Sequence, residues 1–436
     1  MSMMVKNNIE ALRVINLLDQ NNNMMQRDLT KVATGMKINS AQDDSAPWSI
    51  SERMRMRIRA LEQDNQNVEN DVALMKTAEG AVSSTIELLK TLKERAINSA
   101  NDSNTDEDRA TIQKEVNQFI DQIDDNALVQ FNGKYLVDGS KNNVVSASKT
   151  ILLNQSLATD TASNSALTAL QNRVGDSLEI LSSDKYTVSW VANGTTATTS
   201  GTVGTSVNLA TLLTKAPGSI FAATGASAGT IGTDKFNVQV YTPDRKPGIA
   251  LVASTAGVTR QVSGFTISIT DSDGNVKKAA NAALDAFKLY QRAENMTGDK
   301  SLTFHTGPEA NVAIKVGMGD MRAEALGLKG AGNDRLSVTT KEKANAAINV
   351  IDNALSMALN QQVDIGSVLS RLDYTQSNII TARDNDQESE SVIRDADMAK
   401  EMTNYTKSNV LLQTAQAMLA QANQNPSAVL SLLQTQ

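Results

Sequence analysis

Apolar side chains between residues 47 and 99 recur at alternating intervals of three and four positions, and no other feature limits the possible folds as strongly. The members of this seam are Ile58, Leu61, Val68, Val72, Met75, Val82, Ile86 and Leu89. Asn65 and Glu79 fall on the same seam and interrupt it. The repeat is typical of helices that pack side by side. A helix over 47–99 spans about 80 Å at 1.5 Å per residue, so it must lie against other rods.

Related spacing predicts four further helices, at residues 1–36, 106–126, 340–394 and 396–423. The seam of the third comprises Ala344, Ile348, Ile351, Leu355, Ala358, Val363, Val368 and Leu372. Asp44 or Ser45 can cap the 47–99 helix, with Pro47 in its first turn. Pro426 is expected to end the last helix, because proline cannot donate the next backbone hydrogen bond.

The composition changes between residues 142 and 298, where Thr, Ser, Gly and Ala dominate. Strands are expected at 186–191, 236–241 and 264–270, and helices near 164–173, 207–214 and 278–292. This mixture predicts a separate α+β insert. The Ser/Thr-rich stretch 193–206 is interpreted as a flexible loop, with O-glycan attachment as the alternative. After the insert, 301–304 and 311–316 alternate as the strands of a hairpin do.

Bulk properties exclude several classes of protein. The net charge of −7 and pI near 5.1 argue against a nucleic-acid partner, which needs a basic surface. The absence of cysteine excludes disulfides and thiolate metal sites. No window holds about 18 consecutive apolar residues, so no membrane insertion is expected. Lys6, Glu10 and Arg13 interrupt any signal-peptide core, so export would need a route without an ordinary cleaved signal.

The C-terminal stretch Ser408–Gln436 contains no charged residue. Its Gln and Asn residues are mixed with Leu, Ala, Val and Met around all sides of the predicted helix. A lone surface helix would carry a charged face, so this stretch is expected to be buried among several helices. Within one chain, only the 1–36 helix is a natural companion. Stacking of copies would complete the packing; a tail that docks within its own chain or stays disordered is the open alternative.

The residues that could carry chemistry are few, and they predict no metal, no cofactor and no enzyme. His305 is the only histidine, which rules out a His-Glu-x-x-His zinc motif. Asp271–Asn275 resembles the start of a calcium loop but lacks the glutamate at its twelfth position, so a turn is expected. A row of arginines on the 47–99 helix is interpreted as a contact with acidic residues of a neighbouring subunit, or else as a solvated face: Arg53, Arg55, Arg57 and Arg59.

Six stretches resemble the signatures of bacterial flagellins. They are 33–44 (ATGMKINSAQDD), 77–81 (TAEGA), 130–133 (QFNG), 318–328 (MGDMRAEALGL), 393–399 (IRDADMA) and 419–426 (LAQANQNP). The resemblance covers about 1–140 and 301–436, while the insert resembles no known family. The chain is similar to the filament subunit of the bacterial flagellum.

This resemblance implies a fold that is mainly α. A long antiparallel helical coiled-coil rod is built from both chain ends, with a β-hairpin and an inserted α+β outer domain. The expected divisions are an N-terminal inner-tube helix at 1–42, rod segments at 43–141 and 301–395, a variable surface-exposed insert at 142–300, and a C-terminal inner-tube helix at 396–436. The subunits would polymerise into the helical filament used for swimming, outside the cell, after type III export.

The resemblance also implies partners and contact residues. The chain would bind itself, the filament cap and hook-associated proteins, and an export chaperone on its C-terminal segment. The expected polymerisation core is Leu12, Ile15, Leu29, Val32, Val410, Leu411, Leu419, Val429, Leu430 and Leu433. Further subunit contacts are expected at Asp43, Asp44, Arg53 and Arg57.

Flagellins that activate a Toll-like receptor present a patch that maps onto Leu89, Lys90, Thr91, Arg95 and Glu115. Thr91 stands where activating members have Arg, and Arg95 where they have Leu, so weak receptor binding is expected. Two other functions compete with the filament subunit. A hook–filament junction protein shares such chain ends but does not usually carry the complete ending at 419–424, and a hydrolase on this scaffold would have to depend on His305 alone.

Overall fold

A computed structural model describes residues 8–434, except 163, 216–218, 224–229, 234–238, 244–245, 247 and 333. Side chains of 219–223, 230–233, 260 and 425–434 are outside the description. The chain forms two compact units. Unit 1 comprises Met1–Asn67, Thr306–Val312 and Thr375–Gln436, and unit 2 comprises Val68–His305 and Ala313–Tyr374.

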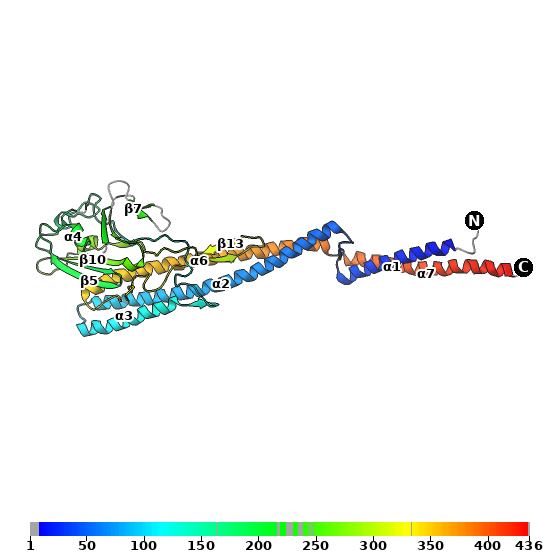
Figure 1. The fold of residues 1–436 in the computed structure, drawn as a ribbon, viewed down its shortest axis with the longest axis horizontal. Coiled ribbons are helices and arrows are strands. Elements are labelled where there is room, and N and C mark those ends of the chain that lie inside the picture. Colours follow the sequence, from blue (N-terminus) through cyan, green and yellow to red (C-terminus); the bar gives the residue numbers. More distant parts are fainter. Residues whose placement is uncertain are drawn as a thin grey trace. The chain divides into compact units, whose positions relative to one another are not determined.

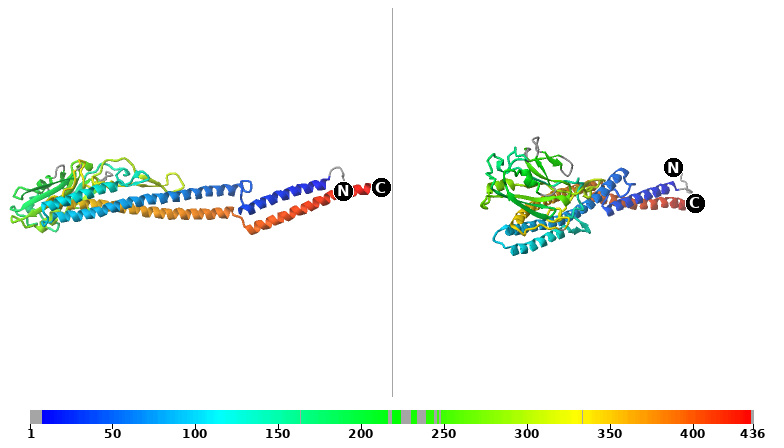
Figure 2. Two further views of the ribbon diagram at one scale, coloured as in Figure 1. Left: turned by 90° about the horizontal axis from the view of Figure 1, so that it is seen from below. Right: turned by 60° about the vertical axis from the view of Figure 1, so that its left-hand side comes forward.

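In unit 1, the helices α1 (Ile9–Thr34) and α7 (Met398–Gln434) lie side by side and antiparallel (Figures 1 and 2). Asn8 caps α1, since its side-chain oxygen accepts a hydrogen bond from the Ala11 amide at 3.0 Å. Gly35 ends α1 in the left-handed region at φ 72°, a conformation that glycine adopts without a steric penalty.

Pro426 does not end the last helix, and this expectation was wrong: α7 continues to Gln434. A proline inside a helix leaves the carbonyl four residues earlier without its amide donor. That carbonyl belongs to Ala422, and it accepts a hydrogen bond from the Asn8 side-chain nitrogen at 2.9 Å. The side chain that caps α1 therefore also satisfies the group that Pro426 leaves open.

The rod helices α2 (Ser45–Ala100) and α6 (Lys341–Arg394) confirm the heptad prediction. Each buries side chains at strict seven-residue intervals: Leu61, Val68, Met75, Val82, Leu89 and Ala96 on α2, and Ala344, Ile351, Ala358, Ile365, Leu372 and Ile379 on α6. Val363 was wrongly placed on the α6 seam and is 68% exposed, because the seven-residue step passes through Ile365 instead. Asn65, a polar seam position, accepts a hydrogen bond from Gln376 at 3.2 Å.

Ion pairs fix α2 and α6 in antiparallel register. Unit 1 contains Glu52–Arg394 at 2.7 Å, Arg57–Asp386 at 3.0 Å and Glu62–Arg383 at 2.9 Å. Unit 2 contains Lys93–Asp352 at 2.6 Å. Residue numbers along α2 rise as those of their partners along α6 fall by similar amounts, as antiparallel packing requires.

The helix α3 (Asp106–Ala127) begins with a capping box between Thr105 and Asp108. The short hairpin β1 (Gln130–Phe131) and β2 (Lys134–Tyr135) follows, and its turn places Asn132 and Gly133 at positive φ. The predicted second hairpin is confirmed as the antiparallel pair β12 (Leu302–His305) and β13 (Ala313–Val316).

The segment between these hairpins contains two main sheets in unit 2. A three-stranded sheet has the order β10 (Val262–Thr270), β4 (Lys185–Ala192), β5 (Thr195–Thr202). A four-stranded sheet has the order β11 (Lys288–Gln291), β3 (Ile151–Asn154), β9 (Ile249–Ala253), β6 (Ser219–Ala223). Smaller elements are β7 (Thr230–Thr233), β8 (Gln239–Tyr241), α4 (Leu209–Leu213), α5 (Lys278–Leu284) and the 3₁₀ turns η1 (Leu167–Ala169) and η2 (Val258–Arg260).

A common apolar core joins the two sheets. Leu152 and Leu251 come from the four-stranded sheet, and Val188 and Ile267 from the three-stranded sheet. Phe265 packs edge-to-face on Phe287, with ring centroids 5.2 Å apart. The expected α+β character is therefore confirmed.

Several local expectations within this segment were wrong. Helix 278–292 stops at Leu284, because residues 288–291 pair with β3 as a strand. Helix 164–173 is reduced to the three-residue turn η1. The supposed flexible loop 193–206 contains strand β5. In each case sheet pairing or core packing outweighs local propensity. Of the strand expected at 236–241, residues 236–238 lie outside the described residues and 239–241 form β8.

Candidate polymerisation surface

The fully buried apolar side chains in the contact between α1 and α7 are all small. Ala11 and Val14 of α1, and Ala415 and Ala422 of α7, are each at most 9% exposed. A hydrogen bond of 2.7 Å from Ser408 to Asp28 joins the same two helices. Each helix therefore covers a narrow strip of its partner, and the pair leaves most of its apolar surface uncovered.

Large apolar side chains lie on the exposed faces of this pair. On α1 they are Ile9, Leu12, Ile15, Leu17, Met24 and Leu29, and on α7 they are Met398, Met402, Val410, Leu411 and Met418. Monomeric soluble proteins rarely expose contiguous apolar patches larger than a few hundred Å². In the described part of α7, the uncharged stretch that begins at Ser408 carries three of these side chains.

The structure can be compared with the expected polymerisation core residue by residue. Leu12, Ile15, Leu29, Val410 and Leu411 are exposed, whereas Val32 and Leu419 are half-buried. Val429, Leu430 and Leu433 belong to the part of α7 whose side chains lie outside the described residues. Sequence reasoning missed Ile9, Leu17, Met24, Met402 and Met418, although a search for every large apolar residue on the two terminal helices could have found them.

Of the expected subunit contacts, Asp43 is engaged inside its own chain. Its carboxylate accepts hydrogen bonds from the amides of Asn39 and Ser40, each at 3.0 Å. Partial burial opposes ionisation of Asp43, but these hydrogen bonds outweigh it and lower its pKa. Asp43 therefore braces the connection between α1 and α2, and its role as a subunit contact stays a prediction. Asp44 is exposed, and its carbonyl accepts from the Trp48 amide at 3.1 Å.

The arginines of α2 differ in whether they have an ion-pair partner within the chain. Arg57 is paired with Asp386 of α6 at 3.0 Å, and its contact with a neighbouring subunit stays a prediction. Arg53 is exposed and forms no ion pair among the described residues.

Sequence reasoning missed Arg394, which is 6% exposed and donates to the Ile38 carbonyl at 3.2 Å and to Glu52 at 2.7 Å. The hydrogen bond from Arg394 is the main cause of the lowered pKa of Glu52. Only the tertiary fold reveals this role, because Arg394 is far from both partners in the sequence.

The expected receptor patch on α2 is largely used by internal contacts. Leu89 is fully buried on the heptad seam in the folded chain. Arg95 pairs with Glu115 of α3 at 3.0 Å, and Lys90 with Glu87 at 2.7 Å. The Thr91 hydroxyl donates to the Glu87 carbonyl at 3.0 Å.

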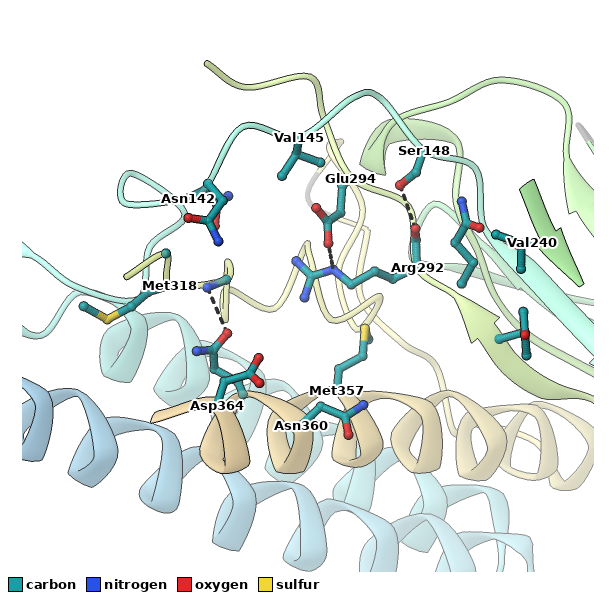
Figure 3. A pocket seen from close by; sticks show the side chains of 16 residues that line it. Asn142, Val145, Ser148, Val240, Arg292, Glu294, Met318, Met357, Asn360 and Asp364 are labelled. Atoms are coloured by element: carbon teal, nitrogen blue, oxygen red, sulfur yellow. Dashed lines mark hydrogen bonds and ion pairs between the residues drawn. The ribbon is translucent and has the colours of Figure 1, made fainter. Parts of the chain in front are cut away.

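A polar cavity of about 460 Å³ lies beside α6 in unit 2 (Figure 3). Arg292 and Glu294 form an ion pair of 3.1 Å in its wall, and Gln361 accepts a hydrogen bond from the Gly319 amide at 2.9 Å. Asn142 and Asn360 add further amide groups. The only histidine of the chain is not in the lining.

Other chemical expectations can also be placed in the structure. The Asp271 carboxylate accepts hydrogen bonds from the amides of Asp273 and Asn275, which confirms the predicted turn. His305 lies exposed on β12. Among the described residues, no group of three metal-ligating side chains comes together. Within the same residues, every helix is too short or too polar to span a lipid bilayer.

Comparison with known proteins decides the family. The profile of the bacterial flagellin N-terminal helical region matches residues 5–142, and that of the C-terminal helical region matches 348–433. A flagellin from Clostridium tyrobutyricum is 31% identical over 427 residues, which cover 97% of this chain and 99% of the relative. The chain belongs to the bacterial flagellin family.

A Bacillus subtilis flagellin is 27% identical over 451 residues, covering 99% of this flagellin and all of the relative. Among solved structures, that of FliC from Burkholderia pseudomallei aligns at 19% identity, with a TM-score of 0.26, over 69% of this chain and 99% of the other. This flagellin is a filament subunit of the extracellular bacterial flagellum. It is a structural protein and not an enzyme.

Proposed function

We propose that the exposed apolar faces of α1 and α7 form the surface through which copies of this flagellin polymerise. The observation that carries the proposal is the mismatch within the pair, which buries small residues and leaves large ones exposed. Burial of one large aliphatic side chain contributes about 1.5–3 kcal/mol. Association of several copies would remove Leu12 and Leu411 from water together with their neighbours.

The polar composition of α7 supports the same surface. From Ser408 onward its polar side chains are uncharged, mainly Gln, Asn, Ser and Thr. A buried amide or hydroxyl needs only a hydrogen-bond partner, whereas a buried charge costs far more free energy. A helix without charge can therefore be surrounded by other helices on all sides.

The test replaces Leu411 by Asp, with Leu411→Met as the matched control. The aspartate would place an unpaired carboxylate in a dry helix bundle, at a cost of several kcal/mol per subunit. We expect Leu411→Asp to stay soluble after high-speed centrifugation, while Leu411→Met pellets as filaments. Circular dichroism should show that both retain the folded rod. Filaments of normal yield from the aspartate variant would contradict the proposal.

The same chain ends are proposed to bind the other components of the filament. The cap and hook-associated proteins would contact α1 and α7 at the ends of the polymer, and an export chaperone would cover the C-terminal segment 396–436 before assembly. Support comes from the exposed apolar side chains of α7, which need a cover in the monomer. Co-purification tests the chaperone: it should bind the full chain but not a chain that ends at residue 395.

Exposed charges are proposed to add lateral contacts between subunits. Asp44 and Arg53 remain available, whereas Asp43 and Arg57 are held by partners within the chain. Arg53→Glu should raise the protein concentration needed for polymerisation. This difference from the wild-type chain should shrink in high salt, because salt screens exposed charges. An unchanged concentration would remove Arg53 from the contact.

Weak binding to the flagellin-sensing Toll-like receptor is proposed as a second activity. Support comes from Arg95, which pairs with Glu115, and from Thr91, whose hydroxyl is turned to the backbone of its own helix. Loss of a central arginine typically costs at least about 2 kcal/mol, or some thirtyfold in affinity. A reporter-cell dose curve with Thr91→Arg and Arg95→Leu should show increased potency; equal potency before and after the change would refute this reading.

A further inference from the structure

The three-stranded sheet of the insert has two edges, and the fold covers only one of them. At the β10 edge, the side-chain nitrogen of Asn353 donates to the Ser263 carbonyl at 2.9 Å, and that of Asn349 to the Phe265 carbonyl at 3.5 Å. Both asparagines lie on α6, one turn apart. A Cβ added to Gly264 would lie 2.5 Å from the Val350 side chain, so α6 runs directly along this edge.

The opposite edge is strand β5, which has no such cover. Within the described residues, its backbone hydrogen-bonds only to β4, in a register that is unbroken over eight residue pairs. Among the described residues, the loop at 334–337 bonds to the first two residues of the strand, through Thr195–Asp334 and Thr196–Ser337, each at 3.3 Å. Further along the strand, Thr198, Ser200 and Thr202 are exposed.

Proteins normally protect such an edge with charged residues, proline or a β-bulge. The sequence of β5 is TTATTSGT, which has none of these devices. Its threonines favour extended backbone, and the strand is long enough to hold a partner by main-chain hydrogen bonds. An uncovered edge of this kind is a template for another strand.

We propose that β5 pairs antiparallel with β5 of a second copy of this flagellin, joining the two sheets into one. The strand is complementary to itself, because it carries no charge that could repel its own copy. A central register would place Thr198 opposite Thr198 of the second copy, because a twofold axis between identical strands sets one residue opposite its own copy. Threonine pairs across neighbouring strands stabilise a sheet through their hydroxyls and branched side chains.

The symmetry of this contact indicates where the second copy lies. An antiparallel pair of identical strands has twofold symmetry, whereas the equivalent subunits of one open helical filament are joined head to tail. The second copy therefore belongs to a neighbouring filament, and the β5 contact bundles filaments side by side. This inference rests on the proposed function, polymerisation through α1 and α7, and on the expected position of the insert at the filament surface.

The first test uses the absence of cysteine from the chain. Thr198→Cys or Ser200→Cys gives each subunit a single thiol on β5, and Ser272→Cys places one on an exposed turn of the insert as the matched control. After mild oxidation of concentrated filaments, we expect disulfide-linked dimers from at least one β5 variant and none from the control. Equal cross-linking of the β5 variants in dilute, separate filaments would overturn the assignment to a neighbouring filament.

The second test places charge on the edge. Thr198→Lys combined with Ser200→Lys sets like charges opposite one another, so bundles should be lost while single filaments still form. Ser272→Lys should leave bundling unchanged. Salt at 1 M shortens the screening length to about 3 Å and should partly restore bundling of the double variant.

Low-speed pelleting measures bundles, and high-speed pelleting measures filaments. Wild-type filaments that form but stay separate would overturn this inference alone, as would bundling of the double lysine variant at the wild-type level in low salt. Failure of the wild-type chain to form filaments would overturn the proposed function and this inference together. Unchanged circular dichroism of each variant identifies the effect as one of contact and not of folding.

Discussion

Replacement of Asn8 should weaken assembly, because this one side chain serves two helices. Its oxygen caps α1 at the Ala11 amide, and its nitrogen donates to the Ala422 carbonyl that Pro426 leaves without a donor. Loss of an N-cap typically costs about 1 kcal/mol, and loss of a hydrogen bond about another 1 kcal/mol. Asn8→Ala loses both interactions, whereas Asn8→Ser keeps a capping oxygen and loses only the amide donor.

The measurement is the lowest concentration of subunit that supports polymerisation, since we expect the ordering of α1 and α7 to be coupled to assembly. A loss of about 2 kcal/mol should raise this concentration some thirtyfold for Asn8→Ala. A loss of about 1 kcal/mol should raise it roughly fivefold for Asn8→Ser. Pro426→Ala restores an amide that can donate to Ala422, so in that background Asn8→Ser should cost little. If Asn8→Ser raises the polymerising concentration equally with Pro426 and with Pro426→Ala, Asn8 does not compensate for the proline.

Three further outcomes are expected. Amide exchange at residues 8–34 and 398–434 should be fast in the monomer and slow in the filament, because the apolar faces gain partners only on assembly; equal protection in both forms would contradict this. Deletion of 145–298 should leave assembly intact but lower the melting temperature of the rod, since β10 covers α6 at Val350; loss of filaments with a folded monomer would show an essential contact in the insert. Burial raises the pKa of Asp285 to about 7, although the hydrogen bonds from Ile267 and Asn349 act to lower it. The stability of unit 2 should therefore fall as pH rises from about 4 to 7, and Asp285→Asn should flatten that dependence in thermal melts.

The direction of the pH effect at Asp285 follows from the difference between its pKa in the folded chain and in the unfolded chain. At pH 3 the carboxyl is protonated in both the folded and the unfolded chain, so it has no differential effect. Between its ordinary pKa of 3.8 and about 7, the unfolded chain releases the proton while the folded chain keeps it. The unfolded state is therefore favoured progressively across this range, and the penalty is constant above it. A flat profile in the wild-type chain would contradict the assignment.

The candidate polymerisation surface was only partly predictable. Its apolar character, and the absence of charge from Ser408 onward, are properties of composition, so Leu12 and Leu411 could be named from the sequence. Which side of each helix faces its partner depends on the register of α1 against α7, fixed by contacts such as Ser408–Asp28. The same applies to Asp43 and Arg57, whose charges are visible in the sequence but whose intramolecular partners are not.

The sequence by itself determined the features that depend on residues a few positions apart. The heptad seam of α2, the capping box at Thr105 and the turn at Asn132–Gly133 follow from local period and local hydrogen bonding. Tertiary structure decided whatever needs a distant partner. Residues 288–291 became a strand because β3 lies beside them, and α7 passes Pro426 where Asn8 supplies the missing donor. These interactions join residues that are distant in sequence, so no local pattern records them.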